Sequence, residues 1–126
     1  AFMKVKLPVV KTNEIIDGRR VFESGEREFE LDLSLGCQMR WEAKFPALAE
    51  KETFVDYSSR LQKLKSENTA VILSKIKVVY CLFDTAMSFT DFLKMFDFTN
   101  IEFTEKLLAR LDEIFTLILN SAAEKN

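Results

Sequence analysis

Four carboxylates at alternating positions are the densest set of reactive side chains in the chain: Glu26, Glu28, Glu30 and Asp32. Two carboxylates that face each other across a cleft can act as a general acid and a general base. Phe29 and Leu31 fill the positions between them, and this alternation predicts a β-strand that presents three of the acids to solvent. Solvated charge explains the spacing without catalysis. An enzyme that uses these carboxylates is therefore a disfavoured hypothesis, and a structure with no pocket holding two of them would remove it.

The chain contains no histidine. This absence excludes Ser-His-Asp and Cys-His nucleophile systems, histidine general bases and histidine metal sites. Cys37 and Cys81 cannot build a structural zinc site without histidine partners, and we expect a buried, reduced pair. Neither GxxxxGK[ST] nor GxGxxG is present, so no phosphate-binding loop is indicated. We therefore expect a protein that is not an enzyme and that holds no metal or cofactor.

Five basic residues lie close together in the sequence, and a solvated helix face explains them better than a phosphate-binding surface does: Arg60, Lys63, Lys65, Lys75 and Lys77. The formal net charge is −2 and the sequence pI is about 5.3. Nucleic-acid binders carry a basic footprint, which this composition lacks. No apolar run approaches the roughly 18–20 residues of a membrane span. We expect neither nucleic acid nor membrane as a partner.

The length of 126 residues, with 48% hydrophobic and 30% charged residues, fits one soluble globular domain. Ala1 and Phe2 precede Met3, which reads as the natural start, and we expect residues 1–2 to be an added remnant. No signal-peptide pattern opens the chain.

The first third of the chain has a strand pattern. Asp17-Gly18 between two short apolar runs is a strong hairpin signal, and Ser24-Gly25 predicts a second turn. Residues 4–33 are therefore predicted to form a small antiparallel β-meander. So small a sheet is not stable alone, and we expect it to pack on the remainder of the chain.

The remainder has helical patterns over residues 34–122. Ser34 is the expected cap of a first helix that Pro46 interrupts. The stretch SENTAVILSKIKVVYCLFD is rich in β-branched residues, so a strand competes there, but its length and lysine spacing favour a helix. The fold class predicted is mainly α (α+β), with the meander packed on a bundle of about four to five helices.

Two later helices have recognisable starts. Ser88 followed by Asp91 approximates a capping box, and Thr99 followed by Glu102 matches one more closely. The last helix is expected to run from about residue 100 to about residue 122, with residues 123–126 frayed.

The segment SFTDFLKMFDFTNIEF, residues 88–103, contains five phenylalanines. Phe89, Phe92 and Phe96 fit one apolar helical stripe. Surplus apolar residues off such stripes mark either additional core or a surface for a partner or for self-association. We predict the second role, as a hypothesis, for five residues: Met95, Phe98, Phe103, Leu117 and Leu119.

Two stretches resemble a known family. The segment MRWEAKFPALAEKETFVDY, residues 39–57, is similar to the Trp-Glu-x-x-Phe-Pro region of tail assembly chaperones from long-tailed (siphovirus-like) phages and prophages of Gram-positive bacteria. The segment KVVYCLFDTAMSFTDFLKMFDFTNIEFTEKLLARLDEIF, residues 77–115, resembles the second half of the same proteins. Together with the alternating N-terminal segment, the resemblance covers about two thirds of the chain.

The resemblance implies a non-enzymatic role in the cytoplasm of the bacterial host, outside the mature virion. Such chaperones coat the helical tape measure protein, keep it soluble and help to recruit tail tube protein, so both are the implied partners, along with weak homo-oligomers. Trp41, Phe45 and Pro46 match family positions and are expected to be structural, with Trp41 anchoring the first helix on the sheet. Glu124-Lys125-Asn126 can be encoded by the slippery heptamer A AAA AAY. That would permit a programmed −1 frameshift to a longer form.

A different class of function stays open. A small helical adaptor or regulator that binds one protein partner stoichiometrically would use the same apolar helix surface. It would give a defined dimer or heterodimer, whereas a chaperone would assemble weakly and bind long helical clients.

Overall fold

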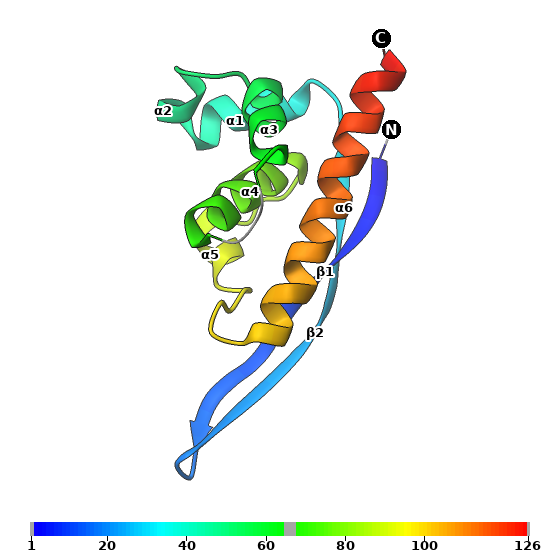
Figure 1. Cartoon of the computed structure of the whole chain (residues 1–126). Helices are drawn as coiled ribbons and strands as arrows, with labels where there is room; N and C mark the ends of the chain where they lie inside the picture. Colours follow the sequence, from blue (N-terminus) through cyan, green and yellow to red (C-terminus); the bar gives the residue numbers. More distant parts are fainter. Residues whose placement is uncertain (1, 65–67, 126) are drawn as a thin grey trace.

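A long β-hairpin lies against a layer of helices, as the computed structural model shows (Figure 1). The structure describes residues 2–64 and 68–125, with the side chains of Phe2 and residues 119–125 left out. The strands are β1 (Phe2–Ile16) and β2 (Arg19–Asp32), and helix α6 (Ile101–Lys125) runs along them. The end of the hairpin projects beyond the helices (Figure 1). The predicted α+β class is confirmed.

The hairpin turns at Asp17-Gly18, as predicted. Both residues have positive φ, 51° and 75°, which is the backbone of a type I′ turn. The second predicted turn, at Ser24-Gly25, is wrong, because β2 continues through it and Gly25 pairs with Val9. The sheet consequently has two long strands in place of a meander with a second turn. The register shifts between Val10 and Thr12, where Lys11 is the unpaired residue of a bulge.

In the part of the chain that the structure describes, five shorter helices come after the hairpin: α1 (Gly36–Lys44), α2 (Pro46–Ala49), α3 (Phe54–Gln62), α4 (Thr69–Leu82) and α5 (Phe89–Leu93). Pro46 ends α1 and starts α2, as predicted. Ser34 is not the cap of α1. Leu35 holds that position, while the Ser34 hydroxyl accepts the Gly36 N–H in the turn before it.

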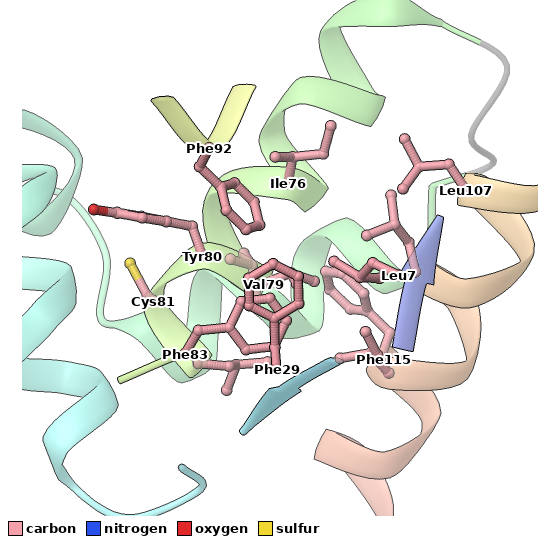
Figure 2. Close-up of a cluster of buried hydrophobic side chains, with 14 of the residues drawn as sticks. Leu7, Phe29, Ile76, Val79, Tyr80, Cys81, Phe83, Phe92, Leu107 and Phe115 are labelled. Atoms are coloured by element: carbon pink, nitrogen blue, oxygen red, sulfur yellow. The ribbon is translucent and has the colours of Figure 1, made fainter. Parts of the chain in front are cut away.

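Helix α4 is the centre of the core, so the helical prediction for its β-branched sequence is confirmed. Its buried residues lie around most of its circumference, which is typical of a helix enclosed on several sides. Figure 2 shows Ile76, Val79 and Tyr80 of α4 in one cluster of side chains with Phe29 of β2 and Phe115 of α6. The hairpin and α6 therefore enclose α4 together with the short helices.

The phenylalanines predicted for a stripe pack in this core. Phe92 is fully buried and its ring contacts those of Phe29, Tyr80, Phe83 and Phe96 at centroid distances of 5.1–5.8 Å. Phe29 stacks on Phe83 at 4.6 Å, where Phe83 also forms a β-bridge with Leu31. Rings from the hairpin, α4 and α5 thus form one aromatic cluster.

Helix α6 begins at Ile101, one residue later than predicted. The Asn100 side chain accepts the Phe103 N–H at 2.9 Å, so Asn100 takes the capping role predicted for Thr99. The helix then continues to Lys125 rather than ending near Ala122, because its last residues include good helix formers and neither Gly nor Pro. Ser88 caps α5 as predicted and accepts the Asp91 N–H at 3.1 Å.

The predicted basic patch does not form as a continuous surface. Lys75 is 3% exposed, with its ammonium 3.1 Å from the Leu64 carbonyl and 3.4 Å from an Asp112 carboxylate oxygen. Arg60 is paired with Glu52 at 2.7 Å. Lys65 lies outside the described residues. Within the described part of the chain, no helix is both long enough and apolar enough to cross a membrane.

Candidate interaction surface

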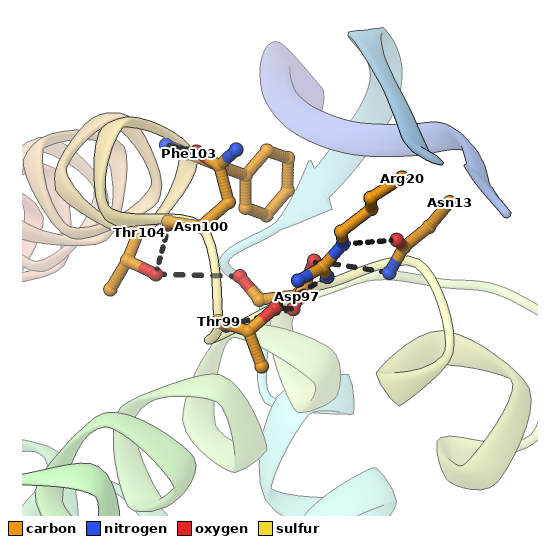
Figure 3. A network of polar contacts seen from close by, with 7 residues as sticks. All are labelled: Asn13, Arg20, Asp97, Thr99, Asn100, Phe103 and Thr104. Carbon is orange, nitrogen blue, oxygen red and sulfur yellow. Dashed lines mark hydrogen bonds and ion pairs between the residues drawn. The ribbon is translucent and has the colours of Figure 1, made fainter. Parts of the chain in front are cut away.

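A polar network joins the hairpin to the segment between α5 and α6 (Figure 3). The Asp97 carboxylate accepts hydrogen bonds from the Arg20 guanidinium at 3.0 Å and from the Asn13 amide at 3.1 Å. Its other oxygen accepts the Thr99 N–H at 2.8 Å and the Thr99 hydroxyl at 2.7 Å. Arg20 also donates to the Thr99 hydroxyl and to the Asn13 side-chain oxygen. The network holds the end of the hairpin near its turn beside the start of α6.

Asp97 is the centre of this network electrostatically as well as geometrically. Its partial desolvation alone would raise its pKa. The hydrogen bonds from Thr99 and the positive charge of Arg20 together outweigh desolvation, so the pKa of Asp97 is lowered from its usual value of 3.8. The Asp97 carbonyl also accepts a hydrogen bond from Thr104 in the first turn of α6. Asp97 therefore holds the hairpin and the helix start at once.

Exposed apolar side chains surround this network on both joined segments. Phe98 and Ile101 are 38% and 75% exposed, and Ile15, Ile16 and Val21 near the turn are 78%, 49% and 38% exposed. Because Arg20 lies next to Val21 and pairs with Ile15 across the hairpin, the network brings this end of the hairpin close to Phe98 and Ile101. Alternation along the strands puts Ile15 on the face of the hairpin that carries Arg20, and Ile16 and Val21 on the opposite face. We call them the tip surface: Ile15, Ile16, Val21, Phe98 and Ile101.

The five residues predicted for partner contact fall in different environments. Phe98 belongs to the tip surface. Phe103 does not, because it is 2% exposed and its ring packs edge-on against Phe22 at 5.9 Å, so that assignment is corrected. Met95 and Leu117 are half-buried against the core, and the Met95 sulfur lies 3.5 Å from the Arg27 guanidinium. The Leu119 side chain lies outside the described part.

The predicted anchors have unequal roles. Trp41 is fully buried, donates its indole N–H to the Glu52 carbonyl at 3.0 Å and contacts Phe54 and Tyr57 of α3. Trp41 thus joins α1 to α3, and the prediction that it anchors α1 on the sheet is corrected. Phe45 is half-buried beside Trp41, and Pro46 is exposed.

An ion pair, and not Trp41, joins the end of β2 to α1. Arg40 pairs with Asp32 at 3.1 Å and donates to the Cys81 carbonyl at 2.6 Å. Hydrogen bonds from the Ser34 side chain and backbone are the main reason why the pKa of Asp32 is lowered, and Arg40 adds to the effect. This contact fixes β2, α1 and the end of α4 together.

The carboxylate run offers no catalytic pair. Glu28 pairs with Lys4 and Glu26 pairs with Arg110, both on exposed surface. A hollow of about 320 Å³ between the hairpin and α6 is lined by Glu26 and by none of the other three acids of the run. The described residues contain no group of three or more side chains placed to hold a metal ion.

Comparison with protein-family models, with curated proteins and with solved structures found no match to this chain.

The tip surface combines residues that sequence reasoning treats separately. The surplus of apolar residues in 88–103 singles out Phe98, but it does not reach Ile15, Ile16 and Val21. A signal that could have found them is present in the sequence, since apolar residues on both sides of a two-residue turn have no core to reach.

Proposed function

We propose that this chain is a phage or prophage tail assembly chaperone, which binds the helical tape measure protein, keeps it soluble and helps to recruit tail tube subunits. The observation that carries the proposal is the tip surface, where five apolar side chains are exposed around a fixed polar network. Two of them, Phe98 and Ile101, lie inside the segment 77–115 that resembles this family.

The tip surface supports a mechanism that needs no catalysis. A long amphipathic client helix has an apolar residue every three to four positions, and these residues form one stripe along the helix. Burial of that stripe against apolar side chains is favourable. Each contact is small, so one copy binds weakly. Many copies bound along one client add up through their effective concentration. A coat of this kind keeps the client soluble and leaves it again when the tail tube takes its place.

The first experiment reads the gene through its stop codon into the next reading frame. The proposal expects A AAA AAY over the codons for Glu124 to Asn126, an overlapping −1 frame and a long helical protein encoded downstream. An isolated gene with no such client nearby would count against it.

The second experiment co-expresses the chain with that downstream protein and measures the client in the soluble fraction. Phe98→Glu and Ile101→Glu each place a charge on the tip surface and are expected to lower soluble client severalfold. Leu35→Glu is the matched control, because Leu35 is 87% exposed before α1 and outside the tip surface. Equal loss in all three variants, or none, would refute the role of the tip surface. A complex of fixed one-to-one stoichiometry would favour the adaptor alternative.

A further inference from the structure

The two edges of the hairpin are not equally open. On the β1 edge, Pro8 has no N–H to offer and Lys11 forms the bulge. Between them, Val10 donates its outward N–H to the Met95 carbonyl at 2.8 Å. Proline, a bulge and a covering segment are the features with which natural sheets close an edge strand. The β1 edge is therefore unsuited to pairing with a further strand.

The orientation of β2 is determined by the same hydrogen bond. Because the Val10 N–H points away from β2, its cross-strand partner Ser24 points its own N–H and C=O away from β1. Orientation alternates along β2, which has no bulge, so every second residue from Arg20 to Asp32 points its backbone groups away from β1. The Leu31–Phe83 bridge involves those of Glu30 and Asp32, so the open part of the edge runs from Arg20 to Glu28. Among described residues, the backbone pairing on this side is the Leu31–Phe83 bridge at its far end.

We propose that β2 pairs with β2 of a second copy of this chain, antiparallel, about a two-fold axis at Gly25. In this register Glu23 lies opposite Arg27 of the second copy. Symmetry repeats this pair, so two opposite-charge pairs form within residues 22–28 and no like charges face each other there. The outward residue Ser24 faces the outward residue Glu26, so the backbone groups of both strands meet as an antiparallel ladder requires.

Other two-fold registers of β2 are worse matched. An axis at Glu23 places this residue opposite its own copy and sets Arg19 against Arg27. An axis at Glu26 places that glutamate opposite itself. An axis at Ser24 sets Arg20 against Glu28, and both already form ion pairs within the chain, with Asp97 and Lys4. Like charges directly opposite each other destabilise a strand pair, so the charge pattern selects the axis at Gly25.

The charged residues of the proposed interface are accessible. Glu23 and Arg27 are exposed, and neither belongs to an ion pair between described residues. The hollow between the hairpin and α6 borders Ser24, Gly25 and Glu26, which leaves space beside the centre of the edge.

The inference extends beyond the proposed chaperone function and does not depend on it, because its test contains this chain alone. Sedimentation equilibrium from micromolar to near-millimolar concentration measures dimer formation by the wild-type chain and by Glu23→Arg and Arg27→Glu. Each variant turns two opposite-charge pairs into like-charge pairs and is expected to weaken dimerisation by about tenfold or more. An equimolar mixture of the two variants restores both pairs in the mixed dimer, so its dimerisation returns to about the wild-type level.

The mixture distinguishes this register from general charge effects and from misfolding, since neither would produce recovery. Glu14→Arg is the control, because Glu14 is an exposed glutamate on β1, outside the proposed pairing. A wild-type chain that stays monomeric throughout, single variants that dimerise normally, or a mixture that fails to recover would each overturn the proposal.

Discussion

Replacement of Asp97 by asparagine tests whether the polar network holds the hairpin on the helices. The substitution keeps the shape of the side chain and removes its charge. An amide group has one oxygen, so its NH₂ must face either the Thr99 donors or the Arg20 and Asn13 donors. Hydrogen bonds to a charged group contribute roughly 1.5–3 kcal/mol, and partial exposure of the network reduces this, so we expect about 2 kcal/mol of lost stability.

The assay is urea denaturation followed by circular dichroism at several pH values. The pKa of Asp97 is lowered in the folded protein, so its stabilisation is present above the unfolded pKa. It is lost as the pH falls below 3.8 through the folded pKa. The difference between wild type and variant is therefore expected to be full near neutral pH and to shrink in acid. Amide hydrogen exchange is expected to increase in residues 13–22 first.

Asp91→Asn is the matched control, because Asp91 lies in the same region but its pair with Lys94 is 3.8 Å long and well exposed. Exposed pairs contribute little, so this variant is expected to change stability by less than about 0.5 kcal/mol. Equal effects of the two substitutions, or an Asp97 effect that persists unchanged in strong acid, would refute the reasoning.

Three further predictions concern the core, a helix cap and the thiols. Phe92→Ala removes a fully buried ring and is expected to destabilise the fold by about 3–5 kcal/mol in urea denaturation, and a loss below about 1 kcal/mol would contradict the packing. Asn100→Ala removes the acceptor of the Phe103 N–H and is expected to lower stability by about 1 kcal/mol in thermal melts. Desolvation raises the pKa of Cys81 to about 12, and burial also raises that of Cys37. A thiol reagent at about pH 8 is expected to label Cys81 only after denaturation and Cys37 slowly before it, and rapid labelling of both would contradict their burial.

Local signals predicted the elements of this fold well. Asp17-Gly18 has the chemistry of a type I′ turn, Pro46 interrupts a helix by removing a donor, and Ser88 supplies a capping oxygen. Each of these effects acts within a few residues. The helical state of α4 was harder, because its β-branched residues suit both a buried strand and a buried helix, and length decided between them.

Features that depend on distant residues could not be predicted in the same way. Phe103 is a different case, because it lies four residues before Leu107 and eleven before Ile114, so the helical period alone places it on the buried stripe of α6, and the prediction for it was wrong for a local reason. The Arg20–Asp97 contact joins residues 77 positions apart, and no local pattern marks either as a partner. The Lys11 bulge, between the pairs Val10–Ser24 and Thr12–Glu23, is likewise marked by no local pattern.

The hairpin at the start of the chain packs against the last helix, and this has a consequence for folding during synthesis. Leu7 and Phe29 of the hairpin bury against side chains from α4 and α6, and Phe115 is made roughly 80 residues after β2 is complete. At roughly 5–20 residues per second, the nascent hairpin waits several seconds without its cover. During this interval its apolar face and both edges are available to other chains. Slow codons or a bound helper at that stage would therefore influence the yield of folded protein.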